Sequence, residues 1–97
     1  MIPERQAAAG TAGFRSGEVD FHGLRTRTSG HRGFAEVHML VPGDWDVRRS
    51  HDLVEHVEAA VRADLPDVEL TVHVEPREDP RSYDDYATEI PLDGTPD

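Results

Sequence analysis

Cysteine is absent from this chain of 97 residues. Without thiols the chain can form no disulfide framework, no thiolate metal site and no cysteine nucleophile. A transition metal, if one is bound, would have to be held by histidine nitrogens and carboxylate oxygens.

Basic residues are scarce: 10 stand against 20 acidic residues, which gives a formal net charge of −10 at pH 7. A chain this acidic is poorly suited to bind nucleic acid or an anionic membrane surface. The same charge is compatible with cations as ligands.

Long apolar runs are missing too, because each run covers only a few residues. A helix that crosses a bilayer needs about 20 apolar residues, and the N-terminus has no secretory signal pattern. We therefore expect one cytoplasmic domain that does not insert into a membrane. A core this small would gain stability from oligomerisation or a bound metal.

Hydrophobic periodicity predicts three strands. Residues 19–27 and 34–41 are expected to form an antiparallel hairpin, because the segment between them is rich in glycine and small polar residues. Residues 68–75 are expected to form the third strand, which Pro76 ends.

The clearest helix is predicted at 47–64, with Asp46 as its N-cap and Pro66 beyond its end. Apolar residues at spacings of three, four and seven predict one buried stripe, formed by Val47, Val54, Val57, Val61 and Leu65. A weak helix is expected between Pro3 and Arg15, where alanines favour it and two glycines oppose it.

These elements predict an α+β fold of order (α)ββαβ, with a three-stranded mixed sheet whose helices lie on one face. The second strand is expected in the centre, because the crossover through the helix makes strands two and three parallel. We divide the chain into a weak N-terminal helix or extension (1–18), a metal-binding αβ domain (19–76) and an acidic tail that we expect to be mobile (77–97).

Three histidines fall on the more polar face of their strands, because side chains alternate between faces with period two. They are His22, His38 and His73. Adjacent strands lie about 4.8 Å apart, which lets their imidazoles converge on one ion. Glu75 shares the parity of His73 and can add an oxygen. His51, in the first turn of the helix, could reach a site on its own chain or on a partner's.

Such a set of nitrogen and oxygen ligands suits Zn²⁺, Co²⁺, Ni²⁺ or Fe²⁺. The competing interpretation is that these histidines are surface or hydrogen-bonded residues of the sheet. No nucleophile triad, phosphate loop or spaced carboxylate pair is present, so we do not expect an enzyme.

Five segments that carry these residues also resemble a known family. They are 21–27, 36–40, 41–45, 50–53 and 72–76, and the strongest blocks are His-Gly-Leu-Arg-Thr-Arg and His-Val-Glu-Pro. From residue 19 to residue 80 the chain is similar to the C-terminal cytoplasmic domain of cation diffusion facilitator (cation efflux) transporters.

The resemblance implies a ferredoxin-like, or metallochaperone-like, fold and a homodimer that holds zinc or a related ion near its interface. His22, His38 and His73 match family ligand positions, and Glu75 matches a position that is often acidic. His51 matches a helix histidine that completes a site, in some members from the other subunit. Metal binding would draw two domains together and tune cation export by the attached membrane domain.

Two features depart from the family. The membrane-spanning part is absent, so this chain alone transports nothing, and the first helix is short and contains glycine. Two alternatives therefore stay open: a free-standing cytosolic metal buffer or carrier of the same fold, and a metal-independent ferredoxin-like dimerisation module.

Overall fold

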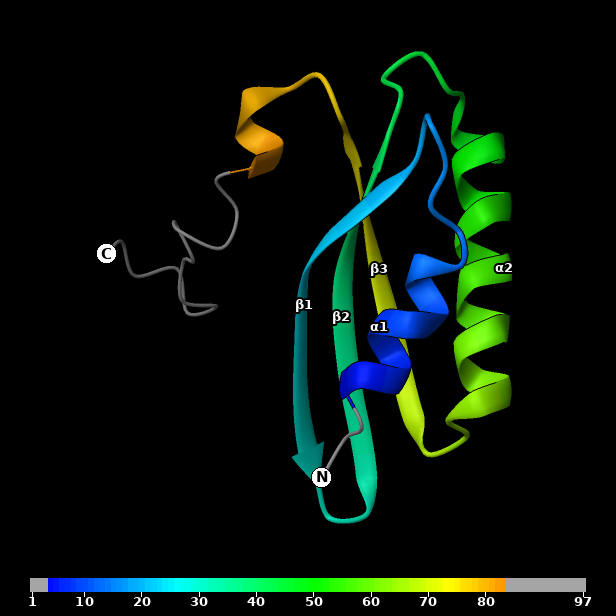
Figure 1. Ribbon diagram of the computed structural model, residues 1–97, viewed down its shortest axis with the longest axis vertical. Coiled ribbons are helices and arrows are strands. Elements are labelled where there is room, and N and C mark those ends of the chain that lie inside the picture. Colours follow the sequence, from blue (N-terminus) through cyan, green and yellow to red (C-terminus); the bar gives the residue numbers. More distant parts are fainter. Residues whose placement is uncertain (1–3, 84–97) are drawn as a thin grey trace.

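The computed structural model describes residues 4–83, and its elements follow the order αββαβ (Figure 1). The helices are α1 (Glu4–Ala12) and α2 (Val47–Asp64). The strands are β1 (Asp20–Ser29), β2 (Arg32–Val41) and β3 (Val68–Pro76), and a short 3₁₀ helix, η1 (Pro80–Tyr83), follows them. The predicted α+β class and order are confirmed.

The three strands form one sheet in the order β1-β2-β3. Strand β1 pairs antiparallel with β2, and β2 pairs parallel with β3, so β2 is central as expected. Both α-helices lie on the same side of the sheet, while η1 lies toward the other side (Figure 1). Within residues 4–83, no α-helix covers this second face.

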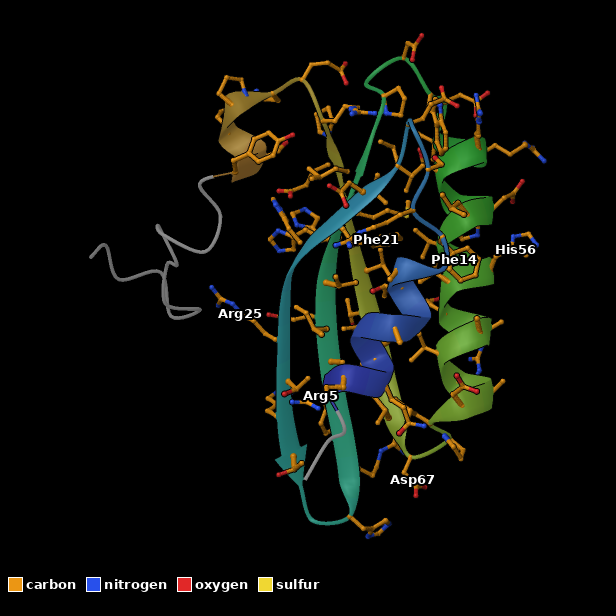
Figure 2. The ribbon with its side chains drawn as sticks, viewed as in Figure 1. Arg5, Phe14, Phe21, Arg25, His56 and Asp67 are labelled. Carbon is orange, nitrogen blue, oxygen red and sulfur yellow. The ribbon has the colours of Figure 1, made fainter. Side chains whose placement is uncertain are left out.

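The core lies between the sheet and the helices. Val57 and Val61 of α2 are buried in the same cluster as the inward-facing residues of the sheet, and Phe21 of β1 points into this layer (Figure 2). Gly10 explains how α1 joins this layer, because a Cβ there would lie only 3.1 Å from Cγ2 of Val61. The glycine that lowers helix propensity thus permits the close approach of the two helices.

Helix α2 begins at Val47 as predicted, because Asp46 caps it by accepting a hydrogen bond from the backbone N–H of Arg49 at 2.7 Å. The prediction that Val47 belongs to the buried stripe is wrong, since its side chain is 85% exposed. Cα–Cβ bonds in a helix tilt toward the N-terminus, so a residue in the first turn leans beyond the end of the packed surface.

Strand β1 contains a β-bulge that the alternation of its residues did not predict. The register shifts between His22 and Arg25, and Gly23 there has a φ of 67°. The extra residue reverses the parity of all that follows. Strict alternation from His22 would place Leu24 on the same face, but Leu24 packs against the core.

The chain after β3 is folded as far as the structure describes it. The hydroxyl of Ser82 donates to the carbonyl of Pro76 at 2.7 Å, and the hydroxyl of Tyr83 donates to the carbonyl of Arg77 at 2.8 Å. The rest of the predicted acidic tail, residues 84–97, lies outside the described residues.

Val61→Ala should lower the free energy of unfolding by about 2 kcal/mol, because it removes two buried methyl groups and leaves a cavity. Val47→Ala makes the same chemical change in the same helix on an exposed side chain, so its effect should stay within about 0.5 kcal/mol. Urea unfolding followed by circular dichroism measures both, and equal losses would contradict the assignment of the core.

Gly23→Ala should destabilise the protein by about 1–2 kcal/mol, because an L-residue is strained at a positive φ. Gly17→Ala is the matched control, since a Cβ there meets no atom within 4 Å and its φ is not positive. If unfolding midpoints of the two variants coincide, the bulge is not a constraint on the sheet.

Candidate metal centre

The pairing of the strands aligns the three strand histidines in one row. His22 is the register partner of His38 across the antiparallel pair, and His38 is the partner of His73 across the parallel pair. The ring centroids of His22 and His38 lie 5.3 Å apart, and those of His38 and His73 lie 5.1 Å apart. Side-chain exposure rises from 18% for His38 and 22% for His22 to 65% for His73.

Glu75 provides a buried carboxylate beside this row. Its side chain is 7% exposed, and its Oε1 atom lies 3.1 Å from Nδ1 of His38 and 3.4 Å from Nε2 of His22. Its Oε2 atom lies 3.9 Å from Nδ1 of His73. The two carboxylate oxygens thus face different members of the row.

The donor atoms fit a divalent transition cation. One ligand atom each from His22, His38 and Glu75 lie within 4.8 Å of one another. Four-coordinate zinc with ligand bonds of 2.0–2.1 Å has ligand atoms about 3.3 Å apart. The two contacts between imidazole and carboxylate already have this spacing, so small side-chain movements would complete a three-ligand set.

The bulge in β1 places the backbone of Gly23 against the central histidine of the row. A Cβ built on Gly23 would lie 3.7 Å from both Cγ and Nδ1 of His38, so the imidazole of His38 rests over the glycine. The backbone at Gly23 therefore sets both the strand register and the space available to the central ring.

His51 does not join the cluster within this chain. It lies on α2 with an exposed side chain, and its Nε2 atom is 3.6 Å from Oε1 of Glu55 one turn later. Its role as a ligand supplied to another copy stays a prediction. His56 on the same helix is also exposed and points away from the sheet (Figure 2).

Tyr83 stands beside the cluster and was not among the predicted site residues. Its ring lies 5.6 Å from the ring of His22 at an interplanar angle of 86°, an edge-to-face arrangement. An aromatic residue in an otherwise polar, acidic segment was the only signal in the sequence that this part of the chain packs against the domain.

The clear pKa shifts concern groups on α2 and at the start of η1. Hydrogen bonds from the Arg81 side chain and backbone lower the pKa of Asp79, and the same carboxylate raises the pKa of Arg81. Partial burial, reinforced by the neighbouring carboxylate of Glu55, raises the pKa of Glu58. The pair of Asp79 and Arg81 thus braces η1, which carries Tyr83.

The structure is a small α+β domain that carries a row of imidazoles beside a carboxylate, a donor set that could hold a metal ion. A family model described as the cytoplasmic domain of cation efflux proteins matches residues 10–77. This chain belongs to that family.

Known relatives agree with this assignment. The chain is 40% identical over 97 residues to the uncharacterized transporter sll1263 of Synechocystis sp., and the match covers 94% of this chain and 31% of that protein. The Zn form of CzrB has a TM-score of 0.71 and 34% identity, covering 80% of this chain and 92% of that one. The metal-bound C-terminal domain of the CzcD transporter from Thermotoga maritima shares the fold, with a TM-score of 0.69, 24% identity and coverage of 82% and 99%.

The chain thus spans about a third of the length of the curated relative that it matches. Among residues 4–83, neither helix is long and apolar enough to cross a bilayer.

Glu75→Gln should weaken Zn²⁺ affinity at least tenfold, because it keeps the side-chain shape but removes the negative charge between the imidazoles. Glu69→Gln is the matched control, because this glutamate lies on the same face of β3 and is exposed. Titration calorimetry measures both dissociation constants, and equal affinities for Glu75→Gln and the parent would exclude the carboxylate as a ligand.

Proposed function

We propose that this chain is the cytoplasmic regulatory domain of a cation efflux transporter, and that it binds zinc or a related divalent cation and closes as a homodimer when the cation is bound. The observation that carries the proposal is the convergence of His22, His38 and Glu75, whose ligand atoms lie within 4.8 Å of one another. Co²⁺, Ni²⁺ and Fe²⁺ suit the same donors.

Zinc is favoured among these ions by the comparison with a Zn form of CzrB, whose chain is 34% identical to this one. Two neutral imidazoles and one carboxylate are a common ligand set for zinc, and they leave a coordination position for a further donor. A bound cation would also offset the negative charge of Glu75, which is 7% exposed.

A second copy can reach the cluster from the sheet face that carries no α-helix. His73 is 65% exposed there, and Oε2 of Glu75 is directed toward it. His51 is equally exposed on α2, so a partner's His51 could approach donors that its own chain does not reach. We propose that His73 and Glu75 of one copy, with His51 of the other, form the contact at which the dimer closes.

Electrostatics makes closure depend on the cation. Each copy carries a net charge of −10, so two copies repel each other at close approach. A ligand shifts a conformational equilibrium only by the difference in its affinity for the two states. Donors contributed by both copies would supply that difference, because the open state lacks the complete set.

The attached membrane domain is part of the proposal. The relative sll1263 is a transporter more than three times as long as the match, and this chain aligns with 31% of it. In such a protein, closure of paired cytoplasmic domains would alter the distance between the membrane parts to which they connect.

Zn²⁺ at about 100 times its dissociation constant should add about 2.7 kcal/mol to the free energy of unfolding and raise the melting temperature. His38→Ala should abolish the rise, because it removes the central imidazole, whereas His56→Ala, an exposed histidine of α2, should keep it. Differential scanning fluorimetry in chelator-free buffer measures these melting temperatures. If Zn²⁺ does not raise the melting temperature of the parent protein, the metal hypothesis is wrong.

X-ray scattering with and without Zn²⁺ tests closure separately. The dimer should become more compact with the metal. His51→Ala should remove most of this compaction, while zinc should still bind to the cluster of His22, His38 and Glu75. A dimer whose dimensions ignore zinc would favour the metal-independent dimerisation module, and a monomer that binds zinc would favour the free-standing buffer or carrier.

A further inference from the structure

We infer that Tyr83 is a positioning residue of the metal centre, which holds the imidazole of His22 in the orientation that binds the cation. This inference rests on the proposed function, because it concerns the same cluster. Tyr83 lies outside the part of the chain matched by the family model, which ends at residue 77.

The segment that carries Tyr83 is fixed in place by the end of β3 and by neighbouring loops. The backbone N–H of Arg77 donates to the carbonyl of Val41, and its guanidinium donates to the carbonyls of Gly17 and Glu18, all at 2.8 Å. The carboxylate of Glu78 accepts two contacts of 2.9 and 3.1 Å from the backbone N–H of Gly43. Contacts with the end of β2 and with the loops that precede β1 and follow β2 therefore fix the position of η1.

Contacts between η1 and the residues just before it then orient the tyrosine. The side chain of Ser82 is buried, and its hydroxyl donates to the carbonyl of Pro76 at 2.7 Å. Asp79 accepts hydrogen bonds from the backbone and the guanidinium of Arg81. The hydroxyl of Tyr83 donates a hydrogen bond to the carbonyl of Arg77. The contact of Tyr83 with His22 is therefore made by its ring and not by its oxygen.

The imidazole of His22 needs such a support. Among residues 4–83 its only polar side-chain contact is the 3.4 Å approach of Nε2 to Oε1 of Glu75. Its other ring neighbours are His38 at 5.3 Å and Tyr83 at 5.6 Å. Edge-to-face packing against Tyr83 therefore restricts rotation of the His22 ring.

Restricting that rotation raises metal affinity by preorganisation. The apparent dissociation constant of a ligand increases in inverse proportion to the fraction of protein that is in the binding-competent state. If the ring of His22 is competent in a third to a tenth of the molecules once Tyr83 is removed, the dissociation constant rises by about three- to tenfold.

The test compares the parent protein with Tyr83→Ala and Tyr83→Phe by calorimetric titration with Zn²⁺ and by the visible absorption spectrum of bound Co²⁺. Tyr83→Ala should weaken Zn²⁺ binding about three- to tenfold and change the Co²⁺ spectrum, because the geometry at His22 is no longer enforced. Tyr83→Phe keeps the ring and should restore both the affinity and the spectrum.

Arg81→Ala serves as a control for general loosening of η1, because its side chain is exposed and belongs to none of the ring contacts of His22. Its affinity and spectrum should stay closer to those of the parent than the values of Tyr83→Ala. An NMR spectrum of each metal-free variant confirms folding and reports the ring-current shift of the His22 protons, which should be lost only in Tyr83→Ala.

Parental affinity and spectrum in Tyr83→Ala would overturn the inference while leaving the proposed function intact. Equal weakening in Tyr83→Phe and Tyr83→Ala would also overturn it, because the hydroxyl contact with Arg77 would then be responsible rather than the ring. Failure of the parent protein itself to bind Zn²⁺ or Co²⁺ would instead refute the proposed function.

Discussion

Strand pairing across β2 is the constraint on which the rest of this structure depends. Antiparallel pairing with β1 and parallel pairing with β3 bring His22, His38 and His73 to the same level of the sheet. A slip of one residue in either pair would turn a histidine to the helix-covered face. The helices fix the register indirectly, because the apolar residues that they bury occupy the opposite parity.

The buried carboxylate of Glu75 makes this row of imidazoles a candidate cation site. A carboxylate that is 7% exposed is costly to desolvate unless it is paired. Among residues 4–83 its charged partners are imidazoles rather than arginine or lysine. A cation that the imidazoles share with it would balance its charge. Such an arrangement suits a site that binds and releases a cation better than it suits a permanent salt bridge, as the proposed function requires.

Much of this site could be predicted from the sequence, because strand alternation depends only on backbone geometry. Parity placed His38, His73 and Glu75 on one face, and His22 joined them because it precedes the bulge. Leu24 follows the bulge and was misplaced, since one glycine inside a strand signals an irregularity without fixing where the register changes. The periodic pattern did not predict that Val47 is exposed, because periodicity does not mark where the packed surface ends.

The position of Tyr83 beside the cluster could not be predicted, because it depends on tertiary contacts that leave no local pattern in the sequence. The segment that places Tyr83 beside His22 is held by Arg77, Glu78 and Ser82. Arg77 and Glu78 bind residues that are distant in sequence, and the hydroxyl of Ser82 is buried in a hydrogen bond. Propensity and periodicity report on neighbours along the chain, so a segment anchored in this way resembles an unstructured tail.

Anomalous diffraction from crystals grown with Zn²⁺ tests the central claim most directly. The account predicts an anomalous peak at the zinc absorption edge, at a position within bonding distance of Nε2 of His22, Nδ1 of His38 and Oε1 of Glu75. Density for zinc only at other residues, or well-ordered side chains at this cluster with no anomalous peak under saturating metal, would contradict it.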